Sequence, residues 1–169
     1  WNDGTKWSGG SAPSANDTAV ITVAGTYTVT MNVSPTVAKL VLGNGSGYQT
    51  LNINGQTLTL ANNSTINPHG ILDFQNYSTL AGAGTLTNNG KILLNLYGTI
   101  SANINNKDTI IVDHYGNNFT GTYTNTASSV LHFRCANNSG QITFSNGWTN
   151  NGKILMAGPY YYSQLFVSA

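Results

Sequence analysis

Residues 87–93 read Thr-Asn-Asn-Gly-Lys-Ile-Leu, and the same seven residues recur unchanged at positions 149–155. The second copy begins 62 residues after the first (149 − 87), which is about three times a unit of roughly 21 residues. Short apolar segments of such a unit start at residues 50, 71, 91, 109, 130 and 153. Successive starts lie 18 to 23 residues apart by subtraction, so the sequence indicates a repeat protein.

Each repeat holds one or two further segments rich in Thr, Leu and Ile, separated by Asn, Gly and Ser, a composition that favours strands and turns. A rung of two or three short strands is one coil of a parallel β-helix. We therefore predict an all-β, right-handed parallel β-helix (β-solenoid) with rungs of about 20 residues. The expected single domain has an entry segment at 1–27, coils at 28–158 and a cap at 159–169. An antiparallel sandwich also has regularly spaced strands, but it does not explain the seven-residue identity.

Charged residues are scarce: six are basic and five acidic, and together they make up 7% of the chain. A neutral surface does not attract nucleic-acid phosphates or anionic lipid, and no apolar run is long enough to span a membrane. We expect no nucleic-acid partner, no membrane insertion and a secreted or cell-surface location. The single cysteine, Cys135, excludes an intrachain disulfide, and its alternating surroundings predict a buried thiol.

Four segments near the start carry a resemblance: WNDGTKWSGG at 1–10, NDTAVI at 16–21, GTYTVT at 25–30 and VAKLVLG at 37–43. This opening resembles the start of passenger-type β-helices in bacterial autotransporter-like and other secreted adhesin-like proteins. The resemblance implies a β-helix fold and an extracellular adhesion or structural role. It carries over no catalytic residue, because the pattern contains none.

Alternation along the aligned strands divides inward from outward positions. Two columns are apolar in every repeat and are expected to fill the core: Leu51, Leu72, Ile92, Ile110, Leu131 and Ile154, and Ile53, Phe74, Leu94, Val112, Phe133 and Met156. Between them, Leu93, Ile111 and Leu155 are expected to face outward, so either a partner or another part of the chain covers them. Asp113 and Arg134 fall in neighbouring outward positions and are expected to form an exposed ion pair.

Tyr77, Tyr97 and Tyr115 occupy one position in three consecutive repeats. If the strands hold register, their rings form a ladder along the axis. Such a ladder is a structural device, and it is also a platform for the apolar C–H faces of sugar rings. Asn95 and Asn117 lie nearby and are candidates for hydrogen bonds to sugar hydroxyls. The candidate ligand is a polysaccharide or a host or cell-surface glycan.

The two chain ends are candidate caps, because the open ends of a solenoid expose unpaired strand edges. Trp1, Trp7 and Pro13 are expected to cover one end, and Tyr160, Tyr161 and Tyr162 the other. Alternatively, the two ends dock head to tail, which produces a filament.

The sequence offers no catalytic set, metal site or cofactor site. No two of its five aspartates are expected in one outward column on adjacent coils, and a Cys135–His114 dyad would be buried. Thr-x-Thr pairs recur at 28/30, 57/59, 85/87 and 122/124, but the rung length varies, so we do not expect a flat ice-binding array. We predict a non-catalytic extracellular adhesion or structural module, with a carbohydrate-binding module as the alternative and a filament subunit as a lesser one.

Overall fold

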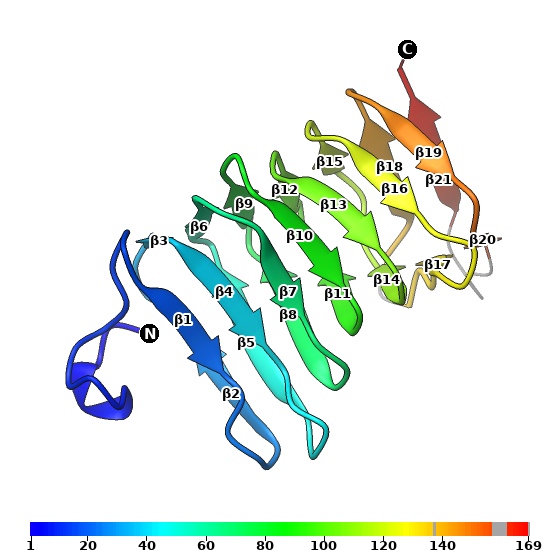
Figure 1. The fold of residues 1–169 in the computed structure, drawn as a ribbon. Coiled ribbons are helices and arrows are strands. Elements are labelled where there is room, and N and C mark those ends of the chain that lie inside the picture. Colours follow the sequence, from blue (N-terminus) through cyan, green and yellow to red (C-terminus); the bar gives the residue numbers. More distant parts are fainter. Residues whose placement is uncertain (137, 157–161, 169) are drawn as a thin grey trace.

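The computed structural model describes residues 1–136, 138–156 and 162–168, and it contains one 3₁₀ turn (η1, Gly4–Lys6) and 21 strands. The strands form three seven-stranded sheets, in which every described pair is parallel. Each of seven successive coils contributes one strand to each sheet, and the coils stack along one axis (Figure 1). The prediction of a β-solenoid is confirmed. The sandwich alternative is wrong, because its strands would be antiparallel.

The three sheets, here called A, B and C, follow one another in every coil. Sheet A contains β1 (Thr18–Ile21), β4 (Lys39–Leu42), β7 (Ser64–Ile66), β10 (Thr85–Asn88), β13 (Asn103–Asn106), β16 (Tyr123–Asn125) and β19 (Trp148–Asn150). Sheet B contains β2 (Tyr27–Thr30), β5 (Gln49–Asn54), β8 (Gly70–Gln75), β11 (Lys91–Leu94), β14 (Thr109–Val112), β17 (Val130–Phe133) and β20 (Lys153–Met156). Sheet C contains β3 (Thr36–Val37), β6 (Thr57–Leu60), β9 (Thr79–Ala81), β12 (Thr99–Ile100), β15 (Asn117–Phe119), β18 (Gly140–Phe144) and β21 (Ser163–Val167).

The six predicted apolar segments are the strands of sheet B from β5 to β20, and they pair in the expected register. The two predicted core columns are therefore aligned, and their members from β5 to β17 are buried. The two members in β20 are exceptions, because Ile154 is half-buried and half of Met156 is exposed. In the described part of the chain no strand pairs with the far side of β20, so the core is not closed over Met156.

Both expected domain boundaries need correction. Strand β1, which lies within the expected entry segment, pairs with β4 and buries Ala19 and Ile21, so the first coil begins at Thr18. Strand β21, which lies within the expected cap, pairs with β18 and belongs to the last coil. In each case, the segment pairs with the unpaired edge of a neighbouring strand, because this satisfies the main-chain hydrogen-bonding groups of both.

The N-terminal segment lies against the open side of the first coil (Figure 1). The Trp1 amino group donates a 2.7 Å hydrogen bond to the Thr30 carbonyl oxygen, and the Trp7 Nε1 donates one of 2.9 Å to that of Trp1. The two indole rings meet edge to face, with their centroids 5.1 Å apart. Trp1 is buried as part of the core cluster, so both tryptophans cover this end of the solenoid.

A ladder of asparagines runs inside the solenoid where sheet A ends. Asn88 donates to Asn106 (2.7 Å), Asn106 to Asn125 (2.8 Å) and Asn125 to Asn150 (2.8 Å), each from Nδ2 to Oδ1. Asn88, Asn106 and Asn125 are completely buried. Water does not reach these buried amides, so they satisfy one another's hydrogen-bonding groups. The ladder thereby links four successive coils.

Because of the ladder, we expect substitutions at two neighbouring asparagines, Asn106 and Asn105, to differ in their effect on the free energy of unfolding. Asn106→Ala leaves the Asn88 Nδ2 and the Asn125 Oδ1 with fewer partners, so we expect a loss of about 1–3 kcal/mol in the free energy of unfolding. Asn105→Ala, one residue away on the outward face, should change it by less than about 0.5 kcal/mol. Urea denaturation followed by circular dichroism measures both. Equal losses would contradict a stabilising ladder.

Candidate functional site

The three tyrosines lie in the turns that connect sheet B to sheet C, here called the B–C corner. Tyr77 follows β8, Tyr97 follows β11 and Tyr115 follows β14. The Tyr77 and Tyr97 rings are stacked, with centroids 4.5 Å apart and an interplanar angle of 5°. Tyr115 instead meets Tyr97 edge to face, at 5.0 Å and 83°. The alignment thus brings the three rings together, but only the first two are parallel.

Backbone conformation explains how the first two rings reach this position. Tyr77 and Tyr97 have φ values of 63° and 49°, in the left-handed region that is uncommon for residues other than glycine. Gly116 lies against Tyr97, and a Cβ at Gly116 would overlap that ring. Gly116 therefore provides the space for the middle ring of the ladder, and no pattern in the sequence singles out this glycine.

Exposure differs along the ladder. Tyr77 has 68% of its surface exposed, whereas Tyr97 is half-buried between its neighbours. The neighbouring Tyr115 side chain raises the pKa of Tyr97 to about 12, so the Tyr97 phenol is uncharged at neutral pH. Among the described residues no ring stacks on Tyr77 apart from Tyr97.

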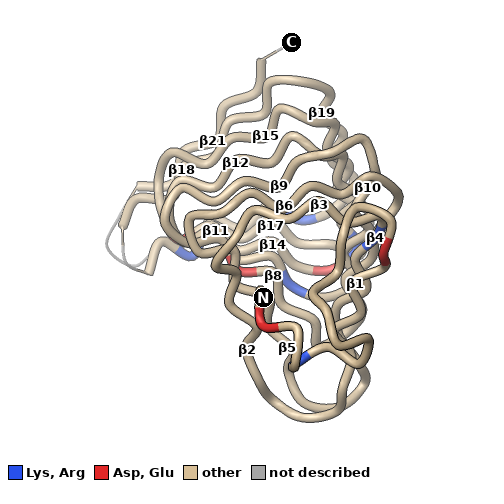
Figure 2. Tube along the Cα trace, turned by 90° about the vertical axis from the view of Figure 1, so that its left-hand side faces the viewer, with Lys and Arg blue, Asp and Glu red and all other residues tan. Residues whose placement is uncertain are grey.

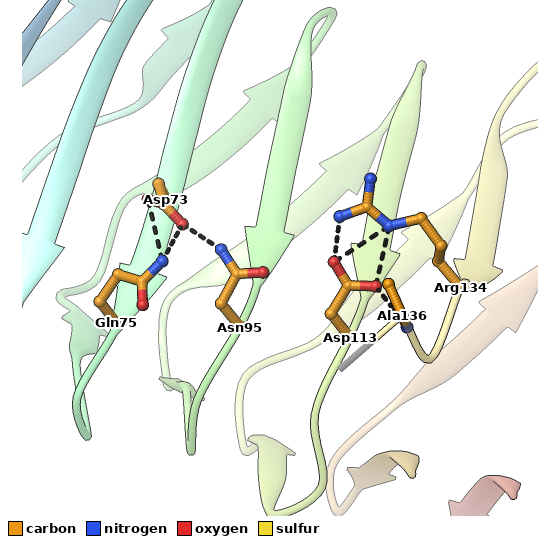
Figure 3. Close-up of polar contacts among 6 residues, drawn as sticks. All are labelled: Asp73, Gln75, Asn95, Asp113, Arg134 and Ala136. Carbon is orange, nitrogen blue, oxygen red and sulfur yellow. Dashed lines mark hydrogen bonds and ion pairs between the residues drawn. The ribbon is translucent and has the colours of Figure 1, made fainter. Parts of the chain in front are cut away.

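The two asparagines proposed to assist a sugar have different environments. Asn95 is half-buried beside the ladder, and its Nδ2 donates a 2.6 Å hydrogen bond to Asp73 (Figure 3). Asn117 is completely buried. Its amide donates to the carbonyl oxygens of His114 and Gln141 and accepts from the Gly98 amide, so it closes the turn. The expectation that Asn117 contacts a ligand is wrong, because its polar atoms already have partners inside the protein.

Asp73 is the centre of a polar cluster on the outer side of sheet B (Figure 3). Its carboxylate accepts hydrogen bonds from the amides of Asn52 (3.1 Å), Gln75 (3.2 Å) and Asn95 (2.6 Å). Burial raises the pKa of Asp73, and the hydrogen bonds from Gln75 and Asn95 oppose that rise. Within the described residues, the Asn52 Oδ1 is buried and has no hydrogen-bond partner. A proton on Asp73 would supply a donor that this cluster lacks.

Asp113 and Arg134 do form an ion pair, but it is not the exposed pair expected. The Asp113 side chain is 1% exposed, and the Arg134 Nε lies 2.9 and 3.1 Å from its two carboxylate oxygens. The amide of Ala136 also donates to Asp113, so the chain after β17 folds over the carboxylate (Figure 3). The two buried aspartates, Asp73 and Asp113, thus belong to separate hydrogen-bonded groups.

The outward apolar column is present on sheet B. Leu93 pairs with Ile111 in register, and both are half-buried; His132 separates them from the exposed Leu155. Tyr160 and Tyr161 lie outside the described residues. Tyr162 is exposed, and its carbonyl oxygen accepts a 2.9 Å hydrogen bond from the Gly140 amide.

Two further features were missed in the sequence. Tyr48 and His69 lie at the turn between sheets A and B, with ring centroids 5.2 Å apart, and line a cleft of about 130 Å³ with Lys91 and Asp108. A larger hollow of about 530 Å³ lies between the N-terminal segment and strands β1 and β2. Tyr48 and His69 occupy equivalent positions in successive coils, directly before the paired residues Gln49 and Gly70, but they differ in residue type, so no repeated residue marks the cleft.

Cys135 is buried, as predicted, and its Sγ accepts a hydrogen bond from the Gly140 amide (3.2 Å). In the described part of the chain, no group of three or more histidine, cysteine or acidic side chains is placed to hold a metal ion. Across the same residues, the structure contains no helix that is long and apolar enough to cross a membrane.

The Asp73 cluster gives a pH prediction. The folded protein holds the pKa of Asp73 above its unfolded value, so protonation favours folding. As the pH falls from above the raised pKa toward the ordinary value of about 3.9, Asp73 should increase the free energy of unfolding. Asp73→Asn should remove this increase and add about 1 kcal/mol at neutral pH, because its amide can donate to Asn52.

Urea denaturation between pH 3 and pH 7, the range that about covers carboxyl titration, measures this effect. Asp108→Asn, at an exposed aspartate, is the matched control and should keep the pH dependence of the wild type. An unchanged pH dependence in Asp73→Asn would contradict the assigned cause.

Comparison with known proteins adds no relative: no family model, no curated protein and no solved structure matches the chain.

Proposed function

We propose that this protein is a non-catalytic adhesion module of a secreted or cell-surface protein, and that it binds a neutral glycan at the B–C corner. The observation that carries the proposal is the exposed Tyr77 ring, which is supported on one face by Tyr97. With 68% of its surface exposed, Tyr77 is accessible to a ligand. A flat aromatic surface of this kind suits the apolar C–H face of a sugar ring.

The stack restricts the motion of Tyr77 before any ligand arrives. A ring that already has one face packed loses less conformational entropy on binding than a free side chain does. Asn76 adds polar groups at the edge of the ring, where its Nδ2 donates a 2.6 Å hydrogen bond to the Asn54 Oδ1. Sugar hydroxyls need such amide groups, which can both donate and accept hydrogen bonds.

The charge of the chain supports a neutral ligand. The formal net charge is +1, and the raised pKa of Tyr97 keeps its phenol uncharged at neutral pH. Electrostatic attraction therefore contributes little to recognition, in contrast to proteins that bind nucleic acids or anionic lipid. Affinity for a glycan would depend on ring stacking and hydrogen bonds.

The solenoid scaffold supports an adhesion role. Seven coils joined by continuous parallel pairing form an elongated body, and the B–C corner lies on its side (Figure 1). Regular side-by-side coils provide extended binding surfaces in repeat proteins generally. One weak aromatic site on such a scaffold gains avidity when several copies act together on a glycan-covered surface.

A glycan array followed by calorimetry on the best neutral oligosaccharide tests the proposal. Tyr77→Ala should weaken binding about tenfold, which corresponds to about 1.4 kcal/mol, because the stacking surface is lost. Tyr48→Ala is the matched control: Tyr48 is an exposed tyrosine (46%) at another corner, and its loss should leave the affinity unchanged.

Three results would contradict the proposal. They are the absence of glycan binding by the wild-type chain, equal binding by Tyr77→Ala, and the release of new reducing ends from the bound glycan. The last result would show catalysis.

A further inference from the structure

The outward face of sheet C carries small uncharged side chains in one register. Strands β6, β9, β12, β15 and β18 pair so that one outward residue from each lies in a single column. This set, here called the threonine column, consists of Thr57, Thr79, Thr99, Asn118 and Thr143. Each of the five is partly exposed.

A second set of small side chains runs beside the threonine column. Residues two positions apart in a strand share a face, so the neighbours on this face are Thr59, Ala81, Ser101, Thr120 and Ser145. Coils repeat about every 4.8 Å along the axis, and the two sets lie about 6.6 Å apart across it. The face is therefore a grid that repeats in two directions.

Most hydroxyls of the threonine column have no partner in the protein. Within the described residues, none of the hydroxyls of Thr57, Thr79, Thr99 and Thr143 makes a hydrogen bond, while Asn118 donates to the Gly116 carbonyl oxygen (3.3 Å). Sheet A has a comparable outward column, which consists of Thr65, Thr87, Asn105, Thr124 and Thr149. There, the Thr65 hydroxyl accepts from Asn89 (3.4 Å), while the other three threonine hydroxyls make no hydrogen bond within the described residues. The two sheets differ in charge, because strand β4 of sheet A begins with Lys39.

The same face lacks the groups that bind other ligands. No strand of sheet C contains a charged residue, and its tube is tan in Figure 2. The rings of Phe119 and Phe144 in these strands point inward and are buried. From β6 to β18 the face thus offers neither a charge for an ionic ligand nor an aromatic ring for a sugar.

We propose that the outward face of sheet C binds ice. Ice is uncharged, its water molecules both donate and accept hydrogen bonds, and its lattice repeats on the scale of the coil spacing. The free hydroxyls hold water at fixed intervals, and the methyl groups between them limit the positions that this water can occupy. An ordered water layer on a rigid sheet can then join the crystal. This activity does not depend on the tyrosines of the B–C corner.

The variation in rung length does not prevent such a grid. The recurring Thr-x-Thr pairs do lie on different sheets: 28/30 on sheet B, 57/59 on sheet C and 85/87 on sheet A. In the fourth pair, Thr124 lies in β16 of sheet A and Thr122 directly precedes that strand. However, the register aligns Thr57 with other threonines, namely Thr79, Thr99 and Thr143. The Thr-x-Thr pairs therefore form no single array, as expected, but the turns absorb the extra residues, so the sheet C strands stay aligned and the threonine column forms.

Ice-affinity partitioning and thermal hysteresis of the full chain test this proposal. The wild-type protein should enter growing polycrystalline ice and lower the freezing point below the melting point. Thr99→Tyr places a large ring in the middle of the threonine column, so both effects should fall to the level of buffer. Thr87→Tyr is the matched control on the outward face of sheet A and should behave like the wild type.

Circular dichroism and thermal melting establish that each variant is folded. If Thr99→Tyr does not fold, Thr79→Lys disrupts the same column with a side chain that exposed positions tolerate. An inactive wild-type chain overturns the proposal, and so does an active Thr99→Tyr or Thr79→Lys variant. Loss of activity in Thr87→Tyr overturns the assignment to sheet C. Tyr77→Ala should retain ice binding, so this test is independent of the glycan proposal.

Discussion

Main-chain hydrogen bonding between successive coils is the constraint on which the other features depend. Each strand pairs with the strand of the coil before and the coil after, so residues at one position in the rung must share one environment. Inward positions become columns of Leu, Ile and Phe, as in the column that contains Leu72, Ile92 and Ile110. A polar residue is accepted inside only where neighbours supply its partners, as in the asparagine ladder.

The same constraint separates the roles of faces and corners. Strands must keep register, so differences in rung length are confined to the turns. Turns can then contain residues in unusual conformations, such as Tyr77 and Tyr97 with positive φ. They can also contain a glycine where a side chain would collide with a neighbour, as at Gly116. The outward face of sheet C instead repeats similar side chains from coil to coil in the threonine column. The glycan proposal rests on a corner, and the ice proposal rests on a face.

Much of the fold was predictable from the sequence. Both copies of the repeated heptapeptide lie in the same part of the rung, where sheet A turns into sheet B. The alternation of the sheet B strands predicted their register and both core columns. The environments of single polar residues were less predictable. Asn117 and Asp113 are buried by turns, and these turns follow no regular sequence pattern from which the burial could be predicted. The expected boundaries excluded strands β1 and β21, which belong to the first and last coils because they pair with β4 and β18.

By itself, the sequence determined a parallel repeat fold, a low-charge surface and an aromatic position shared by three consecutive coils. These properties depend on local alternation and on the repeat, both of which are visible along the chain. Only the tertiary structure decided which threonines share a column and which hydroxyls lack partners. Thr79, Thr99 and Thr143 are spaced unevenly in the sequence, and they come into line because inter-coil hydrogen bonds, not residue counts, set the register.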